Sequence, residues 1–149
     1  MPDDAELLEL YQRAQNAFTD VVDGVEVGQW DDVVASGETV EGLVARLTGQ
    51  ARAVPELLAG SSWGRETLDR LGDDPLSAWE AAADEALAAL AVPDALSGTV
   101  TLSGRETSVR SYVAELVVDL VAGALDLAWA TGQDGLLDPA LRALVARHR

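Results

Sequence analysis

Residues 108–132 read SVRSYVAELVVDLVAGALDLAWATG, and this stretch decides the fold. Ala, Leu and Val recur in it at three- and four-residue spacing, which is typical of a helix with a buried face. Thr107 or Ser108 can cap its N-terminus, because a hydroxyl accepts a hydrogen bond from a backbone N–H that the first turn leaves free. Gly132 suits the left-handed conformation that commonly ends a helix. The stretch therefore predicts one long helix that ends at about Thr131.

Three more long helices are predicted upstream. They cover residues 3–24, 38–53 and 74–92. The second is expected to end near Ala53, because Pro55 disfavours helical geometry in the residue before it. A further short helical turn or two through residues 56–58 is left open. The third opens with a capping Asp and a proline and stops before Pro93. The chain of 149 residues is thus expected to form a single domain over residues 1–149.

Two short elements complete the prediction. The alternation at residues 99–102 indicates a brief extended segment, turned by Ser103-Gly104. Asp138-Pro139 opens a short terminal helix that runs to about Val145. The fold class is all-α: a four-helix bundle with a short extra C-terminal helix and an extended segment before the fourth long helix.

The composition excludes several kinds of catalytic site. The chain has no Cys, its ten basic residues are all Arg, and its one His is His148, next to the end of the sequence. A Cys nucleophile, a Lys Schiff base and a Ser-His-Asp triad are thereby excluded or disfavoured, as is a zinc site that needs imidazole or thiolate. Asp, Glu, Tyr and Arg remain for catalysis, and carboxylates alone could hold a hard metal ion.

The charge of the chain bears on its partners. A net charge of −16 repels phosphate backbones and anionic lipid, so we expect no nucleic-acid partner and no membrane association. The sequence has no signal peptide and no apolar run of about 20 residues, so we expect a cytoplasmic protein. The acidic surface is most simply explained by solubility, and the alternative is a cationic partner.

Candidate site residues lie on the second and fourth helices. Glu115, Asp119 and Gly123 follow one another at four-residue spacing, so they form one stripe of the fourth helix among apolar neighbours. Arg46 stands between apolar residues of the second helix. The pattern leaves open whether Asp119 is buried or lies at a solvated edge, and whether Arg46 only covers apolar surface with its stem.

Several segments resemble a known family. Residues 125–133, LDLAWATGQ, resemble the "WDLARATGQ" stretch of a large actinobacterial family, the DinB-like proteins related to the N-terminal domain of mycothiol-dependent maleylpyruvate isomerase. Residues 39–47, TVEGLVARL, resemble the family's "TVRDLVNHL", and Trp30-Asp31 and residues 100–102 agree in order and spacing. The resemblance spans about residues 5–145 and implies the DinB-like bundle.

The resemblance also implies a divalent metal, held by a His on the second helix and by a Glu and a His on the fourth. These positions fall on Arg46, Asp119 and Gly123, of which only Asp119 keeps an acidic ligand type. The family's "TPC..W" pattern before the second helix is also missing from residues 34–38. We therefore expect a degenerate site without metal or other cofactor, in which Arg46 and Asp119 form a buried charge pair.

Two functions are compatible with such a site. The first is a binding or interaction module that takes a small polar or anionic ligand through Arg46. The second is a metal-independent enzyme of small-molecule or secondary metabolism, an isomerase, cyclase or thiol transferase, with Asp119 or Glu115 as base and Arg46 as oxyanion clamp. The predicted pocket residues are Tyr11, Gln15, Arg46, Gln50, Tyr112, Asp119 and Gly123.

Either function is compatible with a homodimer. Trp129 stands where the family tends to have Arg, so it either faces a partner or packs on the terminal helix of its own chain.

Overall fold

The computed structural model describes residues 3–63, 71–134 and 139–147, and these form a helical bundle. Its four long helices are α1 (Asp4–Asp23), α2 (Val40–Leu58), α3 (Pro75–Leu90) and α4 (Val109–Thr131). A short helix, α5 (Pro139–Arg147), follows them. The predicted fold class is confirmed for this part of the chain.

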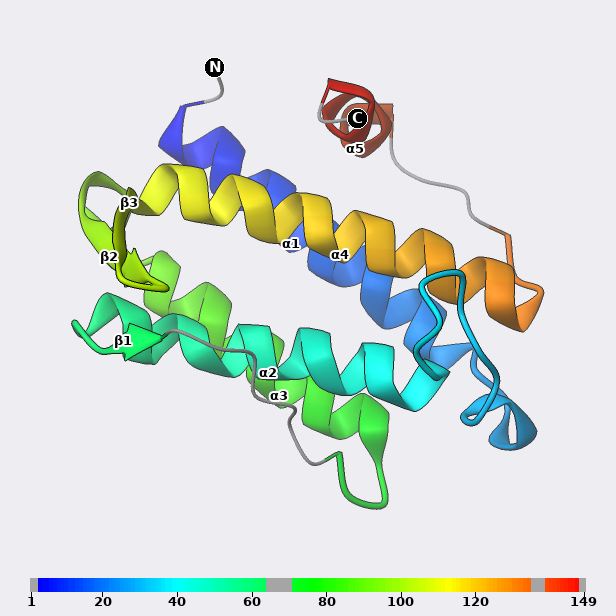
Figure 1. The fold of residues 1–149 in the computed structure, drawn as a ribbon. Helices are drawn as coiled ribbons and strands as arrows, with labels where there is room; N and C mark the ends of the chain where they lie inside the picture. The colour runs from blue at the N-terminus through cyan, green and yellow to red at the C-terminus, as the bar shows by residue number, and fades with distance from the viewer. Residues whose placement is uncertain (1–2, 64–70, 135–138, 148–149) are drawn as a thin grey trace.

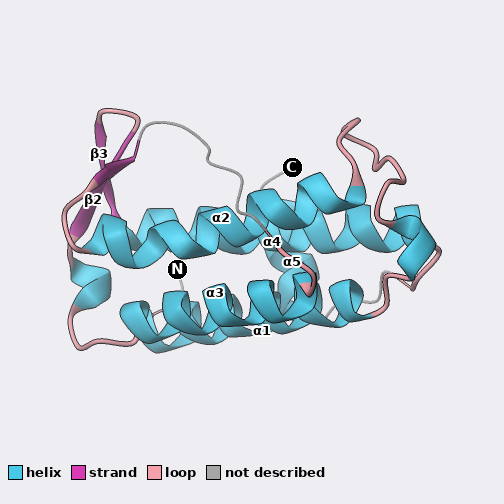
Figure 2. Cartoon of the chain, turned by 90° about the horizontal axis from the view of Figure 1, so that it is seen from below, coloured by secondary structure: helices cyan, strands magenta, loops and turns pink. Residues whose placement is uncertain are grey.

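The four helices lie in the order α1, α3, α2, α4 around the bundle (Figures 1 and 2). α1 and α4 run in one direction and α2 and α3 in the other (Figure 1). The α1–α4 and α2–α3 contacts are extensive, whereas α2 and α4 have the smallest contact among neighbouring long helices. The contact between α2 and α4 is therefore the loosest side of the bundle.

A small sheet closes one end of the bundle (Figure 1). β2 (Thr99–Leu102) and β3 (Arg105–Ser108) form an antiparallel hairpin, and β1 (Ser62–Trp63) pairs in parallel with β2. Ser103 and Gly104 at the turn have φ of 50° and 78°, as a two-residue hairpin turn requires. The sequence predicted the extended segment and its turn, but not β3, because Arg105–Ser108 has no apolar alternation.

The helix ends follow their capping residues. Asp3, Thr39, Asp74 and Ser108 each accept a hydrogen bond from a backbone N–H of the first turn. Gly132 ends α4 in the left-handed conformation, with φ of 71°. Two 3-10 turns, at Val27–Gln29 and Ala95–Ser97, lie in the connections.

The end predicted for the second helix is wrong. α2 continues through Pro55 to Leu58 instead of ending near Ala53. Proline costs a helix about 3 kcal/mol or more. Val54 and Leu57 are nevertheless fully buried, and each such side chain contributes about 1.5–3 kcal/mol, so burial offsets the loss.

The core is built from Ala, Leu and Val around one aromatic pair. The rings of Phe18 and Trp79 meet edge to face at 4.9 Å, and the Trp79 indole donates a hydrogen bond to Thr19. Trp30 packs against this core. No helix in the described part of the chain is long and apolar enough to cross a membrane.

Candidate functional site

A pocket opens on the loose side of the bundle, between α2 and α4 at the hairpin end. Its volume is about 150 Å³. The residues that line it are Gln50, Leu57, Leu102, Tyr112, Glu115, Leu116 and Asp119. α4 contributes the largest share, because residues 112, 115, 116 and 119 fall on one face of a helix.

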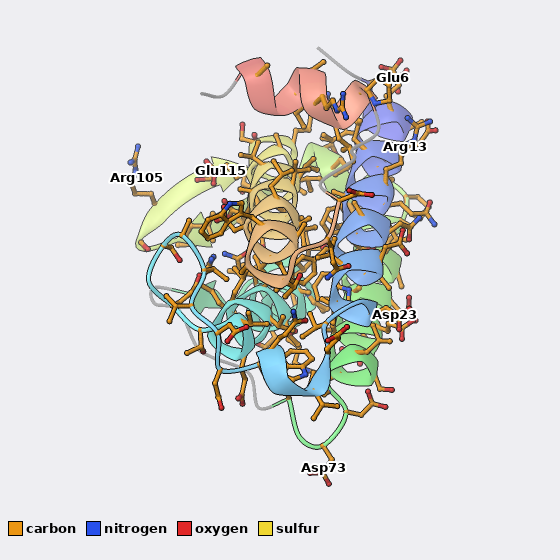
Figure 3. The ribbon with its side chains drawn as sticks, turned by 90° about the vertical axis from the view of Figure 1, so that its right-hand side faces the viewer. Glu6, Arg13, Asp23, Asp73, Arg105 and Glu115 are labelled. Carbon is orange, nitrogen blue, oxygen red and sulfur yellow. The ribbon has the colours of Figure 1, made fainter. Side chains whose placement is uncertain are left out.

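The lining has an apolar part and a polar part. Leu57 from α2, Leu102 from β2 and Leu116 from α4 supply the apolar surface. Glu115 and Asp119 are solvent-exposed, so their carboxylates lie at the mouth. Figure 3 shows Glu115 projecting from α4 on the side where the hairpin lies, while Arg105 of the hairpin points away from the bundle.

A hydrogen bond joins the two helices across this mouth. The Gln50 amide donates to the Asp119 carboxylate, at 3.5 Å between Nε2 and Oδ2. A long bond between partly exposed groups holds the helices weakly. The bond nevertheless keeps two polar side chains between α2 and α4, where two leucines would close the gap between the helices.

Tyr112 is the most deeply buried polar residue of the lining, with 6% of its surface exposed. Burial raises the pKa of the Tyr112 phenol well above its ordinary value, and the neighbouring Tyr11 raises it further. Burial also raises the pKa of Tyr11 to about 12, against a smaller opposing effect of the Gln15 side chain. Both phenols are therefore protonated at neutral pH, and Tyr112 offers the pocket a neutral hydroxyl rather than a base.

Four of the predicted site residues come together in this pocket: Gln50, Tyr112, Glu115 and Asp119. Tyr11 and Gln15 were also predicted there, but both are buried in the core. The Gln15 amide donates to the backbone oxygen of Ala83 on α3, at 3.0 Å. Gln15 thus ties α1 to α3, which is a structural role.

Arg46 binds the Glu38 carboxylate through two hydrogen bonds, at 2.8 Å from Nη2 and 3.3 Å from Nε. Both side chains are about a quarter exposed. The pair joins α2 to the connection that precedes it, and Arg46 is not among the described residues that line the pocket. The pair expected between Arg46 and Asp119 stays a prediction.

Gly123 lies in the packed centre of the bundle. A Cβ added there would stand 2.5 Å from Cδ1 of Leu47, and Phe18 and Leu43 are the next nearest side chains. Leu47 thus occupies the space that a side chain at position 123 would need. Core side chains therefore fill the space beside Gly123, and the glycine leaves no cavity there.

The metal that the family resemblance implies does not fit these residues. Of the three positions, Asp119 is exposed, Arg46 is bound to Glu38, and Gly123 is covered by Leu47. Among the described residues, no group of three or more His, Cys, Asp or Glu is arranged to hold a metal ion. These residues give the site no metal-ligand set.

The fold of this chain is similar to that of a protein of known structure. The crystal structure of a histidine-to-alanine mutant of mycothiol-dependent maleylpyruvate isomerase matches 98% of this chain, with a TM-score of 0.74. The chain has that enzyme's fold. The match covers 67% of the enzyme's chain at 17% sequence identity, so it establishes the fold and not the activity. No family model and no curated protein matches the sequence.

The sequence did not predict the apolar part of the pocket. Leu57 follows the proline at which the second helix was expected to end, and Leu102 lies in the short strand. Leu116 was visible as a neighbour of Glu115 on the fourth helix. Its position one turn after Tyr112 was the available signal that the two side chains share a face.

Trp129 does not pack on α5. Its side chain is 73% exposed, which removes one of its two predicted roles. A role of Trp129 at a partner surface stays a prediction.

Proposed function

We propose that this protein is a small-molecule-binding relative of mycothiol-dependent maleylpyruvate isomerase that does not use the family's metal site. The ligand binds in the pocket between α2 and α4. The similar fold and the resembling segments support the relationship, and the misfit of Arg46, Asp119 and Gly123 to a metal supports the loss of that chemistry.

The observation that carries the proposal is the pocket itself. Around Gly123 the contact between α2 and α4 is filled by Leu47 and Leu43, whereas this end keeps about 150 Å³ with an apolar part and a polar mouth. An apolar cavity of about this volume in another protein binds benzene. Binding sites commonly combine an apolar lining with a few polar groups that fix orientation. The expected ligand is therefore a ring-sized molecule with one polar substituent.

Binding is better supported than metal-independent catalysis. The catalytic alternative needs Arg46 beside Asp119 or Glu115 as an oxyanion clamp. Arg46 binds Glu38, and it is not among the described residues that line the pocket. Binding needs only groups that line the pocket.

The test uses leucine methyl groups as reporters. Protein labelled with ¹³C in the leucine methyls is titrated with benzyl alcohol and followed by NMR. We expect concentration-dependent shifts of Leu57, Leu102 and Leu116, because the ring contacts their methyls. Leu76 at the start of α3 is the internal control and should not shift.

A blocking variant and its matched control complete the test. Leu102→Trp fills the pocket from the hairpin and should abolish the shifts. Leu87→Trp makes the same change at another half-buried position, on α3, and should leave them unchanged. Binding that survives Leu102→Trp in a folded protein, or shifts scattered over the whole bundle, would contradict the proposal.

A further inference from the structure

The outward face of α4 carries a row of apolar side chains. They follow one another at three- and four-residue spacing, which places them on one stripe of the helix. Each of them keeps part of its surface exposed. The row consists of Ala114, Val118, Ala122, Leu125 and Trp129. It extends over about four turns, or roughly 22 Å of helix.

The outward faces of α1 and α3 are polar by comparison. Asn16 and Asp20 are exposed on α1, and Glu80 and Asp84 are exposed on α3. A surface helix normally has charged or polar residues opposite its buried stripe, whereas a helix that is apolar all round is normally covered on both faces. The outward row of α4 therefore has the composition of a face that another element covers.

The terminal helix of the chain leaves the end of this row uncovered. α5 packs across α1 and α4, where it buries Leu141 and Leu144 (Figure 1). Trp129 is nevertheless 73% exposed, and it is the largest of the described apolar side chains that lie mainly in solvent. Tryptophan is among the residue types that most often carry the binding energy of a protein interface. The row thus ends in a side chain suited to anchor a partner.

Acidic side chains border the row on the side that faces α2. Glu115 and Asp126 directly follow Ala114 and Leu125, so they lie beside the row and not within it. Among the described residues, neither carboxylate takes part in a hydrogen bond or an ion pair. Charges that border an apolar seam between helices select the partner helix by its own charges. This border favours a partner with basic residues.

We propose that the outward face of α4 is a docking surface for an amphipathic helix of another protein, one whose apolar face is bordered by Arg or Lys. The apolar face of that helix lies along the row, as in other complexes where a helix binds an apolar surface. Asp126 precedes Trp129 by three residues, so the two side chains are neighbours on the helix surface. An Arg of the partner can therefore stack on the Trp129 indole and pair with the Asp126 carboxylate.

Charge also separates the candidate occupants of this surface. A second copy of this chain would bring a net charge of −16 against another of −16, and like charges across an interface suppress association. A basic helix is instead attracted to the protein as a whole. None of the row residues is among the described residues that line the pocket, so this inference does not depend on the proposed function.

A designed helical peptide serves as the probe. It has about three heptads, with Leu at the two core positions of each and Arg at the bordering positions. A matched peptide carries Glu in place of Arg. Dissociation constants come from the fluorescence anisotropy of labelled peptide at about 0.15 M salt, which screens long-range attraction. The Arg peptide should bind at least tenfold more tightly than the Glu peptide.

A local reporter shows where the peptide binds. In protein labelled with ¹⁵N, the indole N–H signal of Trp129 should shift as the Arg peptide is added. The indole of Trp79 donates to Thr19 inside the core and should not shift.

Variants with matched controls identify the groups responsible. Trp129→Ala should weaken the Arg peptide about tenfold, as loss of an interface anchor does. Val92→Ala shortens another exposed apolar side chain and should change nothing. Asp126→Asn should weaken the Arg peptide about threefold. Asp84→Asn removes the same charge from the exposed face of α3 and should leave binding unchanged.

Three results would overturn the inference. The first is an Arg peptide that does not bind, or that binds no more tightly than the Glu peptide. The second is an equal effect of Trp129→Ala and Val92→Ala, or of Asp126→Asn and Asp84→Asn, because the peptide would then bind the acidic protein without using this face. The third is a dimer of the protein alone, measured by sedimentation equilibrium, that Trp129→Ala dissociates, because a second copy would then occupy the row.

Discussion

Gly123→Ala tests whether the centre of the bundle is filled. The new Cβ would stand 2.5 Å from Leu47 Cδ1, well inside normal contact, and 3.6 and 3.7 Å from Phe18 and Leu43. Leu47 is 1% exposed and cannot move into solvent. Overpacking of this kind costs about 1–3 kcal/mol, whereas replacing a helical glycine by alanine gains about 1 kcal/mol. We expect a net loss of about 1 kcal/mol in the free energy of unfolding.

The effect of Gly123→Ala on stability should change sign in a chain that also carries Leu47→Ala. Leu47→Ala alone should cost about 2–5 kcal/mol, because it leaves a cavity. In that background the clash is gone, so Gly123→Ala should stabilise the protein by about 1 kcal/mol. The coupling between the two sites is then about 2 kcal/mol.

Urea unfolding followed by far-UV circular dichroism measures all four proteins of this cycle. A common slope of free energy against urea concentration across the four would show that the substitutions changed stability rather than the unfolded state. If Gly123→Ala stabilises the wild-type chain as much as it stabilises the Leu47→Ala chain, Leu47 does not occupy this space. A side chain at position 123 would then have room, and core packing would no longer exclude a metal ligand there.

Three further predictions follow from the ion pair, the tyrosines and the missing ligand set. In urea unfolding, Arg46→Ala and Glu38→Ala should each cost about 1 kcal/mol or less, and the double variant should cost no more than either. The raised pKa values of Tyr11 and Tyr112 mean that the folded state keeps protons that the unfolded chain releases above pH 10. Their contribution to the free energy of unfolding is complete below pH 10 and is lost as the pH rises further. For Tyr11 the loss reaches up to about 3 kcal/mol near pH 12. Tyr11→Phe should reduce this loss, as measured by unfolding at alkaline pH. EDTA should leave the thermal unfolding midpoint unchanged, and a lower midpoint would reveal a stabilising metal ion.

The helices could be predicted because their signals are local. Asp74 followed by proline starts α3, and Ser108 and Gly132 bound α4, as expected from the residues alone. Pro55 misled the prediction, because its local cost is outweighed by burial against other helices. Burial of this kind depends on the whole bundle, which no single stretch of sequence contains.

The site could be predicted only in part, for the same reason. The spacing of Glu115 and Asp119 placed them on one face of the fourth helix, and the structure brings both to the pocket. The partner of Arg46 depends on the path of the preceding connection, which carries Glu38 back over α2. Helical spacing does not encode that path, so the contact between Arg46 and Glu38 could not be predicted from it.

A crystal structure of the protein soaked with benzyl alcohol tests the proposed site most directly. We predict the ring between α2 and α4, in contact with Leu57, Leu102 and Leu116. The hydroxyl should lie at the polar mouth of the pocket. A structure with the alcohol bound elsewhere and this pocket empty or closed by its own side chains would contradict the proposed function.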